Sequence, residues 1–470
     1  MLSIIILGAS GDLSRRYVIP SLFNNFRRGY FPDDVYFYGY ARSKHTSESF
    51  RELLRTTLLN KCPLDEQDCE NIVEDFLARV YYVRGDYYGS DDMAELDYFL
   101  RQKEKDGGDR IYYFSLPPQV MPGTLVNIDG LYRGNPTNGS LRLVLEKPHG
   151  EDLQSWSSFV QLLETLSFTP DQIYLVDHYL FKHIVSGIQS LRFGNAIFAD
   201  LFSNKHVDSI QITLSEAIDI QGRGRFYDRV GGVLPDVVQN HLTQIVTLLT
   251  MKEPIKDDAQ SIHYEKLKVL KRIKSLTPEN VFFAQYEGYN TDDSVSIEGE
   301  SNKTPTFVTL GLEINNREWE GVPIIIRAGK NLDEKKLVIK VVFKQPETTS
   351  IGTNLPPNVL EIEIQPKKKI TMWLNGRCSA TGTCRQALPY MVEDPDLADA
   401  YENMLLDIIN GNQDLFVSPY EVEESWRVYD QVLVKNHDFN MNYYKGGSSR
   451  VEGEDAFIKD RFGVEWYTEK

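Results

Sequence analysis

The sequence predicts two domains: an N-terminal Rossmann-like α/β domain with a doubly wound parallel sheet, and a C-terminal α+β domain with a large, mostly antiparallel sheet and helices on one face. The first observation is length, because 470 residues exceed the roughly 250–300 residues that one core supports. The second is a change of pattern. Short apolar runs alternate with helical segments in the first third of the chain, which is typical of parallel sheets, and strands of period 2 follow. We expect the domains to span residues 1–175 and 176–470.

The third observation is a glycine-containing turn after the first expected strand. Ser3 to Leu7 is solidly apolar, as a strand buried on both faces should be. The turn that follows places backbone N–H groups and a helix N-terminus where a dinucleotide pyrophosphate could lie. Many such turns are plain strand-to-helix connections. On the cofactor interpretation, the binding residues are Gly8, Ser10, Gly11, Asp12 and Leu13.

The end of the second expected strand, at 35–40, predicts which nucleotide binds. An NAD site usually offers an acid here to the ribose hydroxyls, whereas an arginine favours a 2′-phosphate. Arg42 occupies this place, with Lys44 close behind it. The expected cofactor is therefore NADP, and the alternative is that both bases merely lie on the surface.

Two more candidate residues follow strands in the same half of the chain. Helical patterns near 46–60 and 67–79 lead to strands expected at 80–83, 111–116 and 141–145. Pro117 and Lys147 come directly after the last two of these strands, at their carboxyl ends, where ligands bind in such sheets. A lysine before a turn is more often simply solvated.

The second half of the chain predicts an antiparallel sheet and a long apolar helix. The helix begins near Pro235 and runs to Met251, and His241 lies in its apolar stripe. A histidine there is usually a satisfied core group, but it also has the fixed ring and limited solvent that a general base needs. The strands are expected at 209–214, 307–314, 322–327, 337–343 and 359–364, and two further helices at 394–412 and 419–434.

Composition excludes several classes of partner. There are 68 acidic against 51 basic residues, so the chain as a whole repels nucleic acid and anionic membranes, and an anionic ligand needs a locally basic pocket. No apolar stretch reaches the roughly 20 residues of a membrane span. The four cysteines are too few to staple so long a chain, and their spacing matches no zinc knuckle, which predicts a reducing, cytoplasmic location.

The segment from Asp177 to His183 combines an acid, two imidazoles, a phenol and an ammonium group in seven residues. If the segment is helical, His178 and Lys182 share one face and repel each other unless an anion lies between them. That arrangement suits a phosphate. The alternative is a solvated helix face.

Eight short motifs are distributed along the chain. They are Gly-Ala-Ser-Gly-Asp-Leu at 8–13, Gly-Tyr-Ala-Arg-Ser at 39–43, Glu-Lys-Pro-His-Gly at 146–150, Asp-His-Tyr-Leu at 177–180, Gln-Asn-His-Leu at 239–242, Arg-Ala-Gly-Lys at 327–330, Asp-Ala-Tyr-Glu at 399–402 and Glu-Glu-Ser-Trp-Arg at 423–427. In this order they resemble the motifs of the glucose-6-phosphate dehydrogenase family.

The resemblance implies oxidation of glucose 6-phosphate at C1 by NADP, the first step of the pentose phosphate pathway, with no metal. His241 resembles the base that removes the C1 hydroxyl proton, and Asp177 resembles the carboxylate that orients it. Lys147 resembles the lysine that bridges cofactor and sugar. The remaining residues that match the substrate site are His178, Tyr179 and Lys182 for the phosphate, Glu216 and Asp236 for the sugar hydroxyls, and Lys330, Lys335 and Gln365.

The chain departs from the family pattern at several positions. Phe181 and His183 stand where the family usually has Gly and Glu, and Leu175 where it has Arg, so we expect an effect on substrate affinity. Some members bind a second, structural NADP, and Lys336 and Lys340 fit that site. Glu363 replaces an arginine there, however, and its carboxylate repels a phosphate, so we expect this second site to be absent or weak. For the oligomeric state, the resemblance implies a homodimer or homotetramer.

Two other functions remain open on the sequence. One is a dehydrogenase of a related sugar phosphate, with specificity reshaped by Phe181. The other is a catalytically silent NADP-binding paralogue, although such a protein has no need of both Asp177 and His241.

Overall fold

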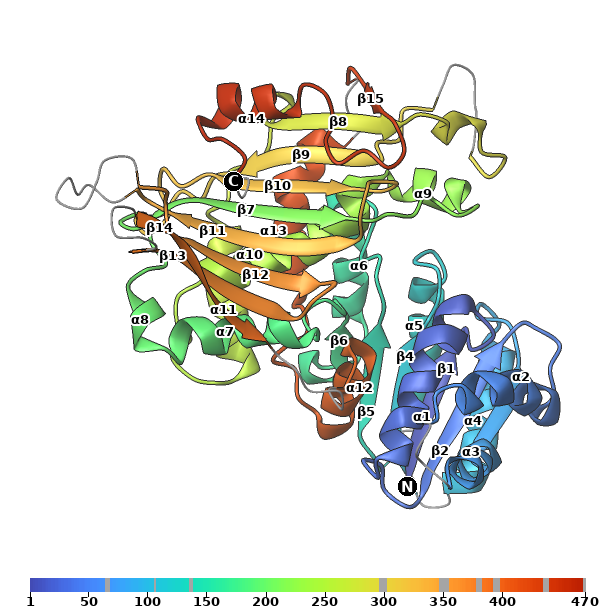
Figure 1. Ribbon diagram of the computed structural model, residues 1–470. Coiled ribbons are helices and arrows are strands. Elements are labelled where there is room, and N and C mark those ends of the chain that lie inside the picture. Colours follow the sequence, from blue (N-terminus) through green and yellow to red (C-terminus); the bar gives the residue numbers. More distant parts are fainter. Residues whose placement is uncertain are drawn as a thin grey trace. The chain divides into compact units, whose positions relative to one another are not determined.

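The chain forms two compact units in the computed structural model (Figure 1). The structure describes residues 1–63, 68–104, 107–134, 138–295, 302–345, 355–377, 383–391, 398–433 and 439–467. Unit 1 consists of residues 1–150, 154–181 and 398–419, and unit 2 of residues 151–153, 182–397 and 420–470. A C-terminal segment therefore returns to the N-terminal unit, which no local pattern in the sequence indicates.

Unit 1 is built on a six-stranded parallel sheet with the order β3-β2-β1-β4-β5-β6. This arrangement confirms the predicted Rossmann-like fold. The sequence missed only the sixth strand, which has three residues and hence too little pattern to recognise. The strands are β1 (Leu2–Leu7), β2 (Val35–Ala41), β3 (Val80–Arg84), β4 (Asp109–Phe114), β5 (Leu141–Leu145) and β6 (Ile173–Leu175).

Helices connect these strands, and one further helix joins them from the C-terminal part of the chain. That helix, α12 (Ala400–Asn410), packs against α1, where the Asn25 amide donates to the Glu402 carbonyl oxygen at 2.9 Å. The others are η1 (Ser14–Val18, π-helical), α1 (Ile19–Arg27), α2 (Ser47–Leu59), α3 (Cys69–Ala78), α4 (Ser90–Glu104), α5 (Met121–Gly134), α6 (Leu153–Thr165) and the 3₁₀ turn η2 (Pro170–Gln172).

The cysteines of unit 1 correct one expectation. Cys62 and Cys69 form a disulfide between the end of α2 and the start of α3. The two helices are in contact, and the Cα atoms of the cysteines lie 5.8 Å apart, within the range that a disulfide requires. The expectation that the cysteines form no disulfide cross-link is therefore wrong for this pair.

Unit 2 contains a nine-stranded sheet with the order β14-β13-β12-β11-β7-β10-β9-β8-β15. It is mostly antiparallel, as predicted, but β10 pairs with β7 and β15 with β8 in parallel. The strands are β7 (Val207–Ser215), β8 (Val281–Tyr286), β9 (Phe307–Leu312), β10 (Ile324–Gly329), β11 (Lys336–Phe343), β12 (Val359–Gln365), β13 (Lys369–Arg377), β14 (Thr383–Met391) and β15 (Asn442–Tyr444).

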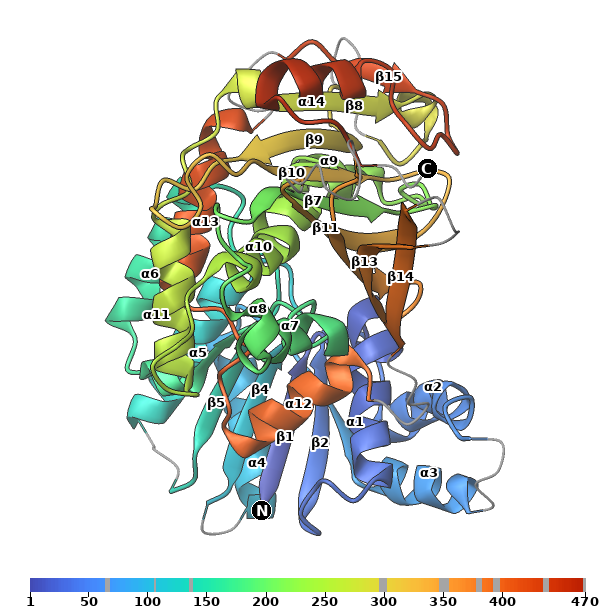
Figure 2. The ribbon, with the colours of Figure 1, turned by 60° about the vertical axis from the view of Figure 1, so that its left-hand side comes forward.

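The helices of unit 2 surround a fully buried central helix, α10 (Thr243–Thr250), which continues the π-helical segment η3 (Leu234–Leu242). Helix α10 packs against α7 and α11 (Figure 2). The segment η3 packs against β10. The remaining helices are α7 (His183–Phe193), α8 (Ala196–Ala199), α9 (Gly224–Val230), α11 (Ala259–Leu270), α13 (Pro419–Tyr429), α14 (Glu454–Phe462), and the 3₁₀ turns η4 (Pro278–Asn280), η5 (Tyr289–Thr291) and η6 (Asp430–Val432).

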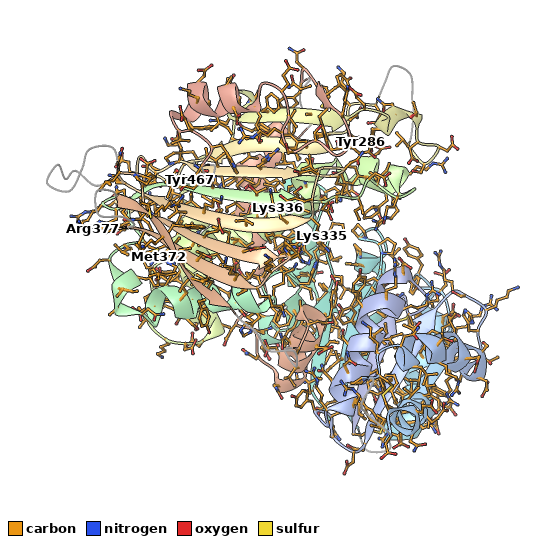
Figure 3. The ribbon with its side chains drawn as sticks, in the orientation of Figure 1. Tyr286, Lys335, Lys336, Met372, Arg377 and Tyr467 are labelled. Atoms are coloured by element: carbon orange, nitrogen blue, oxygen red, sulfur yellow. A yellow bond between two sulfur atoms is a disulfide. The ribbon has the colours of Figure 1, made fainter. Side chains whose placement is uncertain are left out.

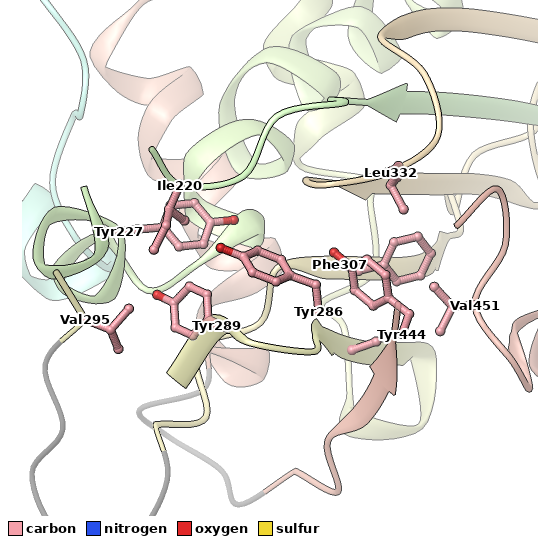
Figure 4. Packing of buried hydrophobic residues seen from close by; sticks show 10 residues of the cluster. Ile220, Tyr227, Tyr286, Tyr289, Val295, Phe307, Leu332, Tyr444 and Val451 are labelled. Atoms are coloured by element: carbon pink, nitrogen blue, oxygen red, sulfur yellow. The ribbon is translucent and has the colours of Figure 1, made fainter. Parts of the chain in front are cut away.

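A buried aromatic cluster supports one end of the β8–β10 region of this sheet (Figure 4). The Tyr444 hydroxyl donates to the backbone carbonyl of Lys330 at 2.6 Å, and the Tyr227 ring lies 5.3 Å from the Lys330 ammonium group. The cluster therefore fixes the backbone and the charged group of Lys330 from two directions. Its members are Ile220, Tyr227, Ala284, Tyr286, Tyr289, Val295, Phe307, Leu332, Tyr444 and Val451.

Candidate active site

The glycine turn after β1 is closed against the neighbouring strand. Gly8 has φ +86°, and a Cβ atom there would lie 2.1 Å from the carbonyl oxygen of Ser115, so no other residue fits. The Ser14 hydroxyl donates to the Gly8 carbonyl at 3.0 Å, and the Ser10 hydroxyl lies 2.6 Å from that of Ser43 after β2. The turn thus joins the ends of three adjacent strands.

The predicted cofactor residues all follow carboxyl ends of parallel strands in unit 1. The strand order reverses between β1 and β4, and a crevice at this switch point is where such folds bind nucleotides. The glycine turn follows β1 and Pro117 follows β4. Arg42 follows β2, is exposed, and its guanidinium carbon lies 5.7 Å from the centre of the Tyr87 ring. The Gly8 and Gly11 N–H groups donate to the carbonyl oxygens of Tyr40 and Gly8 at 2.8 and 2.9 Å, so these two amides close the turn itself.

Lys147 and Asp177 follow the adjacent strands β5 and β6. Asp177 is buried, and one of its carboxylate oxygens accepts the Tyr179 N–H at 3.0 Å. Burial raises the pKa of Asp177, and the charges of His178 and Lys147 oppose that rise. The structure therefore brings this acid and this lysine into one electrostatic cluster.

The segment that begins at Asp177 is a turn, so its treatment as a helix face is wrong. Asp177 accepts one backbone N–H through its side chain, and its carbonyl accepts the Leu180 N–H at 3.0 Å. These bonds hold a turn, and α7 starts only at His183. His178 and Lys182 consequently do not stand one above the other on a helix.

A set of buried groups beneath this turn was not recognised from the sequence as part of the site. The Tyr401 ring stacks on His178, with centroids 5.5 Å apart and planes at 20°. The Tyr113 hydroxyl donates to the Glu146 carboxylate, and burial raises the pKa of Glu146 to about 7. Burial also lowers the pKa of His149. The signal was present, because three of these residues lie in motifs at 146–150 and 399–402.

Four predicted substrate residues gather at one edge of the sheet in unit 2. Strands β7 and β10 are parallel and end there, β11 begins there, and the antiparallel β12 ends there. Register pairs Gly329 with Ser215 and Leu337 with Gln365. Figure 3 shows Lys335 and Lys336 at the beginning of β11. The residues at this edge are Glu216, Lys330, Lys335 and Gln365.

Lys330 lies between two carboxylates at this edge. Its ammonium group lies 2.5 Å from Glu216 and 3.2 Å from Asp236. Burial lowers the pKa of Lys330, but the two carboxylates raise it by more, so the net shift is upward. The lysine remains charged, and the carboxylates have further oxygen atoms to accept hydrogen bonds from hydroxyl groups.

His241 lies in the π-helical segment η3, and only 1% of its surface is exposed. In a π-helix, backbone bonds join residues five apart. In an α-helix such residues would point about 140° apart, given 3.6 residues per turn. The π-helical geometry therefore brings His241 toward the same side as Asp236, five positions earlier. Asp236 also contacts Lys330, so the segment that carries His241 reaches the edge of the sheet.

Comparison with models of protein families shows which family the chain belongs to. The NAD binding domain of glucose-6-phosphate dehydrogenase matches residues 5–187, and the C-terminal domain of the same enzyme matches residues 189–467. The chain belongs to the glucose-6-phosphate dehydrogenase family. Family membership makes it an oxidoreductase with a nucleotide-binding domain.

Relatives and solved structures agree over the full length. The chain is 35% identical to a chloroplastic glucose-6-phosphate 1-dehydrogenase of Arabidopsis thaliana, over 99% of this chain and 83% of that protein. It is 36% identical to a cytoplasmic one of the same plant, over 97% and 91%. A structure of glucose-6-phosphate dehydrogenase in complex with its substrate glucose-6-phosphate superposes with a TM-score of 0.90 at 31% identity, covering 100% and 98%. The Mycobacterium avium enzyme gives 0.85 at 28%, covering 99% and 98%.

Two departures from the glucose-6-phosphate dehydrogenase pattern are buried within unit 1. Phe181 is 1% exposed and packs edge-on against Phe416, with ring centroids 4.9 Å apart. Leu175 is fully buried in β6. His183 is exposed at the start of α7. The first two side chains thus fill the core of the unit.

The sheet of unit 2 shows how Lys336 and Lys340, the bases that would fit a second nucleotide site, are engaged. Lys336 pairs with Glu334, and Lys340 lies 3.4 Å from Glu361. Glu363 lies opposite Val338 on the neighbouring strand. Carboxylates accompany both lysines, so the charge available to a phosphate is reduced.

Proposed function

We propose that the protein oxidises D-glucose 6-phosphate at C1 with NADP⁺ and forms 6-phospho-D-glucono-1,5-lactone and NADPH. The main support is that both domain models match and that Lys330, Glu216 and Asp236 form one cluster at the sheet edge. A buried histidine, His241, lies on the same π-helical segment as Asp236. A protein that only bound a nucleotide would not need this charged cluster.

In this proposal the C1 hydroxyl loses its proton to the ring nitrogen of His241, and Asp177 orients the imidazole and stabilises the imidazolium. The electrons leave C1 as a hydride, and NADP⁺ accepts it when bound. The C–H bond breaks as the C1–O double bond forms, so one proton and one hydride leave the sugar. The chain supplies the base and holds the sugar in place.

The proposed substrate residues fall into two groups. His178, Tyr179 and Lys182 bind the phosphate through charge-assisted hydrogen bonds. Glu216 and Asp236 accept hydrogen bonds from sugar hydroxyls, with Lys330 held between them, and Lys335 and Gln365 lie at the same edge. Lys147 contacts both the sugar and the cofactor.

The preference for NADP rests on Arg42, which is exposed beyond the carboxyl end of β2. Substituting Arg42→Ala is expected to raise the KM for NADP at least about tenfold, because a charge-assisted bond to the 2′-phosphate contributes roughly 1.5–3 kcal/mol. The KM for NAD should stay within about twofold. An unchanged KM for NADP would assign the 2′-phosphate to other residues.

The direct assay follows NADPH absorbance with glucose 6-phosphate and, in parallel, with fructose 6-phosphate, galactose 6-phosphate and unphosphorylated glucose. Activity with glucose 6-phosphate should exceed the others. Activity with a different sugar phosphate alone would establish the related dehydrogenase instead. No activity with any sugar, together with tight NADP binding, would establish the silent paralogue.

Several finer properties are proposals as well. We propose that residues 1–175 bind NADP and that residues 176–470 bind the substrate and form the dimer. The protein is proposed to be a homodimer or homotetramer in the cytoplasm that serves the pentose phosphate pathway. We also propose that the second nucleotide site is absent or weak. Sedimentation velocity reports the oligomer. Equilibrium dialysis that finds two tightly bound NADP per chain would overturn the last of these. Within the described residues, no helix is long and apolar enough to cross a membrane.

A further inference from the structure

A basic concavity lies in unit 2, and it is separate from the sheet edge described above. It has a volume of about 1030 Å³ and is formed by the end of α7 and α8, the chain after α10, the second half of α11, and the turn before β10. In Figures 1 and 2, α7, α8 and α11 lie close together on this side of the unit. None of the predicted catalytic or substrate residues lines it.

Arg192 is the buried cation of this concavity. It is 6% exposed, and its two terminal nitrogens donate to the carbonyl oxygens of Leu248 and Met251 at 2.7 and 2.8 Å. Its Nε is buried and has no hydrogen-bond partner, and among the described residues no carboxylate pairs with the guanidinium. Burial without a counter-charge lowers the pKa of Arg192 to about 9. A buried arginine normally has an anionic partner.

The rim of the concavity carries an excess of positive charge. Two of its acids are neutralised locally, since Glu318 pairs with Lys252 and Glu265 with Lys268, each at 2.6 Å. Asp200 and Glu253 are the other acids. Four more cations line the rim, and in the part of the chain that the structure describes no ion pair engages them: Lys205, Lys271, Arg272 and Arg317. With Arg192, five cations face two acids, in a chain whose net charge is −17.

We propose that this concavity binds a small molecule that carries two or more phosphate groups. Phosphate suits the guanidinium groups of Arg272 and Arg317 because their planar forks donate paired hydrogen bonds to its oxygens. The buried charge of Arg192, whose terminal nitrogens already donate to Leu248 and Met251, adds to the positive potential of the concavity. The volume lies at the upper end of the roughly 300–1,000 Å³ of small-molecule pockets, so the site admits a ligand larger than one phosphate ion. Because the basic rim comes from three separate segments, a ligand with several anionic groups satisfies more of it than a single ion does.

The test is calorimetric titration of the full-length protein with pyrophosphate. Arg192 stays intact because its bonds to the end of α10 support the fold. The variant Lys205→Glu/Arg272→Glu changes two exposed rim residues, and Lys61→Glu/Arg461→Glu makes the same charge change at exposed positions outside the concavity. Reversing two charges beside a multivalent anion should weaken binding at least about tenfold.

The rim variant should lose one pyrophosphate-binding event that the wild type and the control variant retain, while thermal unfolding shows that all three remain folded. Equal binding by the rim variant and the wild type would overturn the proposal. An equal loss of pyrophosphate binding in both variants would also overturn the proposal, because it would reflect only the change in net charge. The absence of pyrophosphate binding by the wild type at millimolar concentration would overturn it as well. The comparison does not depend on the proposed dehydrogenase activity.

Discussion

The ammonium group of Lys330 lies 3.2 Å from the carboxylate of Asp236, although 94 positions separate the two residues in the sequence. Lys330 follows β10, and Asp236 lies on the π-helical segment that packs against this strand. Glu216, at the end of the parallel neighbour β7, completes the cluster at 2.5 Å. The cluster exists because β7 and β10 end at the same edge of the sheet.

The first prediction concerns the charge balance of this cluster. Lys330→Met leaves two mostly buried carboxylates, 29% and 22% exposed, without their cation. We expect a loss of about 3 kcal/mol in the free energy of unfolding, measured by urea denaturation. Lys459→Met is the matched control, because it removes a lysine from a pair with Glu465 at the surface, and stability should change little. Equal effects of the two substitutions would contradict the prediction.

The second prediction concerns the dependence of stability on pH. The pKa of Glu146 in the folded protein is about 7, above its ordinary value of 4.5, because the carboxyl group is buried. The folded protein therefore binds a proton that the unfolded chain has released, and Glu146 makes stability fall as pH rises from about 4.5 to about 7.

The variant Glu146→Gln keeps the shape and an acceptor for the Tyr113 hydroxyl but cannot titrate. Its free energy of unfolding should fall by about 3 kcal/mol less than that of the wild type over the same pH range, as follows from 1.36 kcal/mol per pKa unit. The measurement is urea denaturation at several pH values. Identical pH profiles of the two proteins would show that Glu146 does not titrate in this window.

The third prediction concerns Phe181, where the family usually has glycine. Since the side chain is 1% exposed and packs against Phe416, Phe181→Ala should cost about 3–5 kcal/mol in stability. The ratio of kcat/KM between glucose 6-phosphate and galactose 6-phosphate should stay within about threefold. A large change in this ratio with unchanged stability would mean that Phe181 acts on specificity, as the sequence suggested.

Much of the fold could be predicted because buried parallel strands read as apolar runs and sheet strands as alternating ones. The five longer strands of unit 1 and the core strands of unit 2 were found in this way. Strands β8, β13, β14 and β15 were missed. Strand β13 (Lys369–Arg377) is half-exposed over much of its length, and β15 has only three residues, so neither gives a clear period.

Candidate site residues could be named from the sequence, but the geometry that supports them could not. A sequence does not distinguish bonds to the fifth residue from bonds to the fourth, so the π-helical placement of His241 was not foreseen. The turn at Asp177 depends on a side-chain bond to Tyr179 that competes with helix formation. The contact of Tyr401 with His178 joins positions 223 apart and follows only from the return of α12 to unit 1.

The central claim is that His241 is the base of a glucose 6-phosphate dehydrogenase. The most direct measurement compares NADPH formation from glucose 6-phosphate by the wild type, by His241→Asn, and by a matched control, His183→Asn, at the exposed start of α7. We predict a kcat at least about 100-fold lower for His241→Asn, as expected for loss of a general base, with substrate binding retained and the control close to the wild type. A His241→Asn variant as active as the wild type would contradict the account.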